Sequence, residues 1–128
     1  MLFNIGDVIY DTLTAAYSGQ TAVYPIIQTD ENGKLPFVAY RRTAYQPAYS
    51  KDLYSKIDTY YYSIGVVSDI YKEGVELSDK AIDALISLIG TEVNGKLIQD
   101  VKITNATESA GEDLLFIQDL DFEIKIKK

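Results

Sequence analysis

Three carboxylates recur at every second position near the end of the chain, at Asp119, Asp121 and Glu123. Side chains alternate between the two sides of an extended strand, so these three share one face, which we call the acidic row. The Cα atoms of neighbouring carboxylates are then about 6.5–7 Å apart, within the range of paired glycosidase carboxylates. Lys125 and Lys127 continue the acidic face, and the opposite face carries Gln118, Leu120, Phe122, Ile124 and Ile126.

The spacing of the acidic row also fits an ordinary solvated strand face, because any strand that reads Asp-x-Asp has it. Catalysis would need two carboxylates that converge in a pocket, one of them with a raised pKa. A calcium loop is a weak match at Asp30, Asn32 and Gly33, because no Glu closes it and an Asn-Gly turn explains these residues. The 8 glycines stand singly and form no phosphate-binding motif. We therefore expect no enzyme, no metal site and no cofactor.

Composition excludes further classes of function. The 128 residues include no Cys and no His, so thiol chemistry, disulfides and a Ser-His-Asp site are excluded. The net charge of −7 has the wrong sign for a protein that grips nucleic acid through many phosphates. No apolar run approaches the roughly 20 residues that span a bilayer, and the N-terminus lacks the basic region of a secretion signal. We expect neither a membrane protein nor a secreted one.

Two helices are predicted from apolar residues repeated at intervals of three and four. The first begins at Asn4, which can act as a cap, and ends before Gly19 after about four turns. The second follows Ser68 or Asp69 as a cap and ends near Gly90. The predicted stripe of the first helix is Ile5, Val8, Ile9, Thr12, Leu13 and Ala16. The predicted stripe of the second is Tyr71, Gly74, Val75, Ser78, Ala81, Ile82, Leu85 and Leu88 or Ile89.

The remaining segments alternate with a period of two and predict strands. Pro25 indicates that the strand within residues 21–28 lies at a sheet edge or begins beyond the proline, and Asn32-Gly33 predicts a hairpin to a partner strand at 35–45. A loop over 46–56 leads to a long strand at 57–68, and a final hairpin joins 96–109 to 114–127. The predicted class is α+β: a mainly antiparallel sheet of about five strands with two helices on one face, in the order α-ββ-β-α-ββ, and residues 1–128 as one domain.

Tyrosine is unusually abundant, with 11 of the 15 Phe and Tyr residues. Tyr and Arg are enriched at protein interfaces because each offers apolar area with a polar end. An alternative is a tyrosine-rich surface that binds carbohydrate or peptide, and another is that Tyr60 and Tyr62 simply cover a sheet face. The tyrosines that favour an interface lie beside Arg41 and Arg42, at positions 40, 45, 49 and 54.

The order of segments resembles the tail-component family of long-tailed bacteriophages and prophages. The resemblance is carried by IGDVIYDTLTA, VYPIIQ, LPFVAYRR, YYYSIGVVSDIYKEGVELSDKAIDALI and FIQDLDFEI. The family includes tail terminator proteins, which close the end of the tail tube and form the surface to which the head docks. The resemblance implies a virion structural protein that forms a closed ring of identical subunits, usually a hexamer. It also implies a tail tube protein and a head-completion protein as partners, assembly in the bacterial host cytoplasm, and DNA that passes through without specific binding.

Two surface hypotheses follow from the residues and the resemblance together. Acidic side chains that face a DNA passage would repel phosphates and prevent sticking, so Asp119, Asp121 and Glu123 are candidates for the wall of the bore. An outer, solvated position for the acidic row remains the alternative. Ring closure brings two different patches of one subunit together. For one of them we select the predicted loop around Arg41, Arg42, Tyr45 and Tyr49, where alanine at both tyrosines should weaken assembly without unfolding the subunit.

Overall fold

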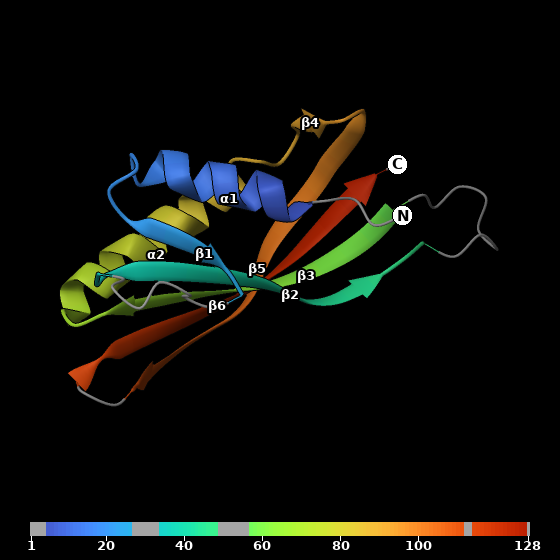
Figure 1. Ribbon diagram of the computed structural model, residues 1–128. Coiled ribbons are helices and arrows are strands. Elements are labelled where there is room, and N and C mark those ends of the chain that lie inside the picture. The colour runs from blue at the N-terminus through green and yellow to red at the C-terminus, as the bar shows by residue number, and fades with distance from the viewer. Residues whose placement is uncertain (1–4, 27–33, 49–56, 112–113, 128) are drawn as a thin grey trace.

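The computed structural model describes residues 5–26, 34–48, 57–111 and 114–127 (Figure 1). It contains two helices and a six-stranded sheet of order β1-β2-β3-β6-β5-β4, with both helices on one face. The α+β class and the placement of the helices agree with the prediction. The elements are α1 (Ile5–Ala16), β1 (Ala22–Pro25), β2 (Phe37–Gln46), β3 (Ile57–Ser68), α2 (Tyr71–Ile86), β4 (Glu92–Val93), β5 (Lys96–Ala110) and β6 (Phe116–Lys127).

The predicted hairpin between the first two strands is wrong, because β1 and β2 run parallel. Ala22 pairs with Phe37 and Pro25 with Tyr40. Both strands therefore start at the same end of the sheet, whereas the strands of a hairpin start at opposite ends. The predicted Asn32-Gly33 turn lies outside the described residues. The edge position of the proline strand is confirmed, since β1 is the first strand of the sheet.

A second Asn-Gly pair forms the hairpin that the sequence analysis overlooked. Asn94 and Gly95 have φ angles of 52° and 79°, and they connect β4 to β5 with Val93 opposite Lys96. Two consecutive residues with positive φ make the type I′ turn whose twist suits a hairpin. This turn adds the sixth strand.

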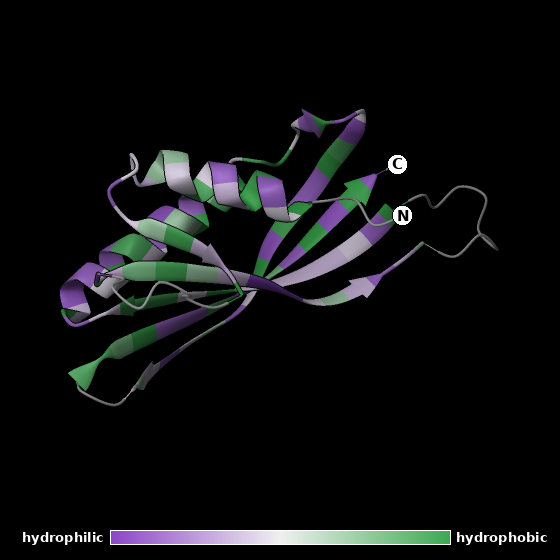
Figure 2. Cartoon of the chain, in the orientation of Figure 1, coloured by the Kyte–Doolittle hydropathy of each residue, from purple (hydrophilic) through white to green (hydrophobic). Residues whose placement is uncertain are grey.

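The remaining strand pairs are antiparallel, and the last strand alternates as predicted. β6 pairs with β3 on one side and with β5 on the other. Figure 2 shows the alternation of hydrophobic and hydrophilic residues along β6, and the hydrophobic ones from Leu120 to Ile126 are buried. The core thus lies between the helices and one face of the sheet. Its fully buried side chains include Ile5, Ile9, Leu13, Val38, Tyr60, Ile64, Val66, Leu85, Ile98, Phe122, Ile124 and Ile126.

The ends of the helices differ only in part from the predictions. Gly19, with φ 72°, follows α1, and its N–H bonds to the carbonyl of Thr14 at 3.1 Å, which confirms the left-handed stop. At α2 the cap position is Ile70, which makes no side-chain cap hydrogen bond. Ser68 contributes indirectly, since its Oγ accepts the Ile70 N–H at 3.0 Å.

The buried stripe of α2 is rotated from the predicted one. Gly74, Ser78, Ala81 and Leu85 are buried as expected, and so is Leu77, which the prediction omitted. Tyr71 and Val75 are exposed instead, although the hydroxyl of Tyr71 still bonds to Glu108 of the sheet. Within the described ranges, neither helix is long and apolar enough to cross a bilayer.

Candidate functional site

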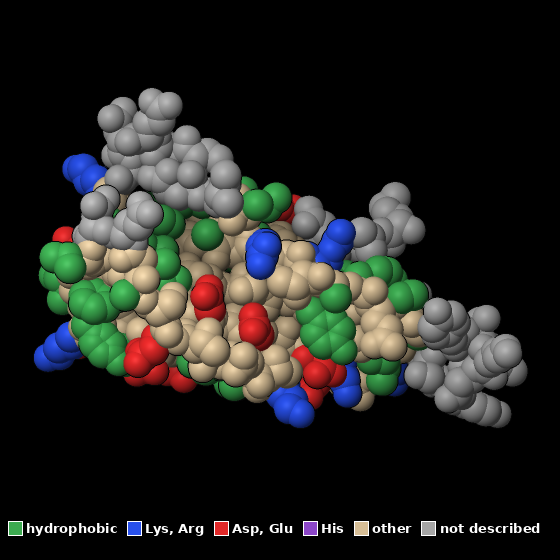
Figure 3. Space-filling view, turned by 90° about the horizontal axis from the view of Figure 1, so that it is seen from below, with side chains coloured by type: hydrophobic (Ala, Val, Ile, Leu, Met, Phe, Trp, Pro, Cys, Tyr) green, Lys and Arg blue, Asp and Glu red, His purple; other side chains and the backbone are tan. Residues whose placement is uncertain are grey.

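The face of the sheet that turns away from the helices carries the acidic row. Asp119, Asp121 and Glu123 are half-buried, while their neighbours Leu120 and Phe122 point into the core. Figure 3, which views the molecule from below, shows carboxylates and basic side chains over a largely polar surface, with hydrophobic side chains gathered toward the left. We call this surface the open face.

Each carboxylate of the acidic row sits in the middle of the sheet, between β3 and β5. Asp119 lies between Gly65 and Thr107, Asp121 between Ser63 and Asn105, and Glu123 between Tyr61 and Lys102. The neighbours of Asp119 and Asp121 are thus small or neutral and polar. A Cβ atom on Gly65 would lie 3.4 Å from Asp119 Oδ1, so this carboxylate lies over the glycine.

The geometry of the acidic row does not fit catalysis or metal binding. The carboxylates stand side by side along the strand and do not converge. Among the residues that the structure describes, no group of three acidic side chains could hold a metal ion. Glu123 forms an ion pair with Lys125 at 3.8 Å, with 22% and 44% of the side chains exposed. Lys102 and Arg41 lie on the same face, so the acidic row stands among basic side chains, and an exposed pair of this kind contributes little to stability.

A hollow of about 370 Å³ lies on the open face beside the acidic row. Thr43 and Ala44 of β2, Tyr61 of β3, Thr104 of β5 and Asp121 of β6 line it. It lies where two strands are irregular, since the register shifts between residues 42 and 44 and between residues 103 and 105. Bulges of this kind bend a strand and change which way its side chains point.

Three of the candidate interface residues lie in the strand that was predicted at 35–45, next to the predicted loop over 46–56. Arg41, Arg42 and Tyr45 belong to β2, which continues to Gln46 because its pairing with β3 resumes after the bulge. Arg41 is exposed opposite Ser63 on the open face, and Arg42 is exposed opposite Tyr62. Tyr49 lies outside the described residues.

Tyr45 packs against the core, so it is a poor choice for a test of assembly alone. Its ring centroid lies 4.8 Å from that of Tyr60, which is 1% exposed. Replacing Tyr45 with Ala would remove this contact and lower the stability of the subunit itself. The expectation that alanine at both tyrosines weakens assembly without unfolding the subunit stays a prediction, and its test needs a measurement of stability beside that of assembly.

Two of the three tyrosines of β3, Tyr60 and Tyr62, cover the helix side of the sheet, as one of the alternatives held. Tyr60 and Tyr62 are both buried. Burial raises the pKa of Tyr62 to about 12, and the nearby Arg42 opposes this rise. Tyr17, also buried, donates a hydrogen bond from its hydroxyl to the carbonyl of Leu77 at 2.9 Å. These side chains stabilise the fold and are not displayed to a ligand.

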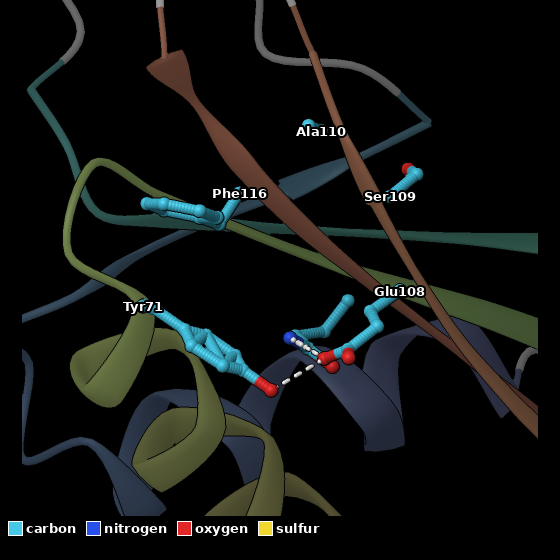
Figure 4. A pocket seen from close by; sticks show the side chains of 6 residues that line it. Tyr71, Glu108, Ser109, Ala110 and Phe116 are labelled. Carbon is cyan, nitrogen blue, oxygen red and sulfur yellow. Dashed lines mark hydrogen bonds between the residues drawn. The ribbon is translucent and has the colours of Figure 1, made fainter.

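A second polar cluster, which the sequence did not indicate, lies where α2 meets the β5–β6 hairpin (Figure 4). Tyr71 donates its hydroxyl to Glu108 Oε2 at 2.8 Å, and Gln118 Nε2 donates to the same oxygen at 3.0 Å. Tyr71 also lies against Phe116, with ring centroids 5.6 Å apart. Together with Ser109 and Ala110 these side chains line a hollow of about 280 Å³.

The hydrogen bonds of this second cluster favour an ionised Glu108. The bonds from Gln118 and then Tyr71 lower the pKa of Glu108, and the same contact with Glu108 raises the pKa of Tyr71. Tyr71 and Glu108 are 37 positions apart, so no local sequence pattern could have paired them.

Comparison with known proteins finds the same fold in solved structures. A chain from the virion of a native gene transfer agent (GTA) particle matches with a TM-score of 0.68 and 16% sequence identity, over 94% of this chain and 92% of that chain. A second solved chain, known by a sequence identifier alone, matches with a TM-score of 0.53 and 14% identity, over 96% of both chains. No family model matches the sequence. No curated protein matches it either. At these identities the likeness shows a shared α+β fold.

Proposed function

We propose that this chain is a structural protein of a virion tail, a tail terminator or head–tail joining protein that forms a ring of identical subunits around the DNA passage. The observation that carries the proposal is the fold shared with a chain from a GTA virion, which extends over nearly the full length of both chains. The ordered resemblance to tail components of phages and prophages supports it independently. The closed ring is usually a hexamer in that family.

The open face gives this ring a physical role. With the helices turned outward, the acidic row would face the bore, and its carboxylates would repel the phosphates of DNA. DNA binders do the opposite, since they neutralise phosphates with Lys and Arg. The subunit therefore guides DNA without binding it, while the two ends of the ring contact a tail tube protein and a head-completion protein. Such particles assemble in the bacterial host cytoplasm.

A structural role also agrees with the chemistry of the surface. The acidic side chains lie along a strand and not in a cleft, so we propose no reaction for them. A tyrosine-rich binding module is not favoured either, because Tyr17, Tyr60 and Tyr62 are buried in the core.

The proposal is tested in the strain that encodes the chain. Its gene is deleted, particles are induced, and heads and tails are counted by electron microscopy. We expect separate heads and tails, with joined particles restored when the parent gene is supplied. In restored particles an epitope-tagged copy should be labelled by gold antibodies at the junction of head and tail. Normally joined particles from the deletion strain, or label elsewhere in the cell only, would contradict the proposal.

A further inference from the structure

Both sheet edges are covered over only part of their length. β1 pairs with residues 37–40 of β2, and the rest of that strand, Arg41–Gln46, has no neighbour on its outer side within the described ranges. At the other edge β4 pairs with Lys96 and Leu97 of β5. Thr91 and Gly90 bond to Ile98, and the outer side from Gln99 to Ala110 is again without a described neighbour. An uncovered edge strand is a template for pairing with another chain.

The exposure of the two edges agrees with this pattern. Residues 41–44 of β2 are all exposed, and so are residues 104–110 of β5. The two free segments lie at opposite sides of one sheet and differ in sequence. They therefore suit a heterologous contact, in which one edge of a subunit meets the other edge of its neighbour, the kind of contact that closes rings.

The strand directions allow this contact in a ring. β2 and β6 run one way, whereas β3 and β5 run the other way, because each neighbouring pair among these four strands is antiparallel. Subunits in a ring all point the same way along its axis. Placed side by side in that orientation, β5 of one copy meets β2 of the next antiparallel, so the alternation of the sheet continues across the boundary.

Steric exclusion by β1 determines the register. Arg41 pairs with Ser63, Ser63 pairs with Asp121, and Asp121 pairs with Asn105. Arg41 is therefore level with Asn105 in the sheet of one subunit. If two copies met level, β1 of the next copy would occupy the space beside residues 106–109. A slide of four residues, about 13 Å along the strand, moves β1 past residue 109 and leaves only Pro25 level with Ala110, the last residue of β5. Closed sheets need such a stagger, because their strands tilt against the barrel axis.

We propose that residues 105–109 of β5 in one copy pair antiparallel with Arg41–Gln46 of β2 in the next, with Arg42 facing Glu108, Arg41 facing Ser109 and Thr43 as the extra residue of the β2 bulge. This inference names the surfaces of the ring and rests on the proposed function for its assembly context. Arg42 lies beside Tyr62 and Glu108 beside Tyr71 of α2, so both side chains are on the helix side of the joined sheet. Their charges are opposite.

In this pairing, Arg42 of the next copy lies beside the second polar cluster. Glu108 is held by two donors, and the exposed ring of Tyr71 lies beside it (Figure 4). A guanidinium can bond to a carboxylate and stack on an aromatic ring at the same time. The bulges in β2 and β5 keep the paired stretch short, which limits pairing in wrong registers.

Disulfide trapping tests the register, because the native chain has no Cys. The test variant carries Arg41→Cys and Ser109→Cys, and the matched control carries Arg41→Cys and Lys102→Cys. All three positions lie on the open face. Within one subunit β2 and β5 are three strands apart, about 14 Å, so neither pair can form an internal disulfide. Any disulfide therefore joins two copies.

The purified full-length variants are oxidised at the highest soluble concentration and separated on non-reducing gels. Oxidation traps transient contacts, so a stable ring is not required. We expect a ladder of covalent oligomers from the 41/109 variant and little from the 41/102 variant. Equal ladders, a stronger ladder from the control, or no ladder from the 41/109 variant would each overturn the proposal.

Charge reversal gives a second readout. Arg42→Glu alone and Glu108→Arg alone should each lower the association constant about fivefold, measured by sedimentation at low salt. The double exchange should restore it, whereas Lys80→Glu on the exposed side of α2 should have no effect. Failure of the double exchange to restore association would refute the contact. If the gold label still lies at the head–tail junction when the charge exchange fails, the proposed contact is refuted but the proposed function is not. If disulfide trapping gives oligomers but no label is found in virions, the proposed function is refuted but the contact is not.

Discussion

Reversing the charge of the acidic row should turn a surface that repels DNA into one that holds it. The variant replaces Asp119, Asp121 and Glu123 with Lys and shifts the formal net charge by six, from −7 to −1. The three side chains span about 13 Å of β6. Duplex DNA carries about one phosphate charge per 1.7 Å of axis, so each lysine has a phosphate within reach.

The expected size of the effect follows from counterion release. Three new phosphate contacts per subunit give a slope of about −2.7 in a plot of log affinity against log salt, and about a 40-fold loss of affinity between 50 and 200 mM salt. Fluorescence anisotropy with a duplex oligonucleotide measures this slope. The parent should show no salt-dependent binding. The fold should persist at a cost of about 1 kcal/mol, since the row lies outside the core.

A matched control separates position from net charge. Lysine at Glu76, Asp79 and Asp83 makes the same change on the exposed side of α2. In particles, the acidic-row variant should assemble normally and deliver DNA poorly, while the helix control should deliver DNA like the parent. Equal DNA delivery by both variants would refute the placement of the acidic row in the bore. Loss of folding in the acidic-row variant alone would show that the row supports the core.

Three further predictions concern the tyrosines. Tyr17→Phe removes the bond to Leu77 and should cost about 1 kcal/mol, or about 4 °C in Tm; an unchanged urea midpoint would mean that this bond contributes nothing. Tyr45→Ala should cost about 2 kcal/mol through lost contact with Tyr60, with Tyr45→Phe as the neutral control; equal stability of both variants would contradict the packing. Burial raises the pKa of Tyr62 to about 12, against about 10 in the unfolded chain. The contribution of the neutral Tyr62 hydroxyl to the free energy of unfolding should therefore be complete below about pH 10 and decline toward pH 12. Urea unfolding at several alkaline pH values should show a smaller decline in Tyr62→Phe, and identical declines would exclude Tyr62 as a source.

Several features of the fold could be predicted from the sequence because they depend on local periodicity. The alternation of β6 decided which of its faces is buried, and Leu120, Phe122 and Ile124 are indeed in the core. The repeats of three and four predicted both helices, and a glycine with positive φ ends the first. The candidate site was predictable to the same extent. The sequence could assign the acidic row to one face of a strand, but it could not identify the residues that surround the row.

Other features depend on contacts between distant segments, and only the tertiary structure decided them. The parallel pairing of β1 with β2 depends on the path of the connecting chain, which local signals do not encode. The burial of Tyr45 against Tyr60, and the cluster of Tyr71 with Glu108, bring together residues that no short-range pattern relates. The uncovered edges likewise arise because β1 is shorter than its neighbour β2, and β4 is shorter than its neighbour β5. The sequence by itself determined the buried face of a strand such as β6, since side-chain direction repeats along the chain. The tertiary structure determined the exact buried stripe of α2 and which edges remain uncovered, since these depend on which elements pack together.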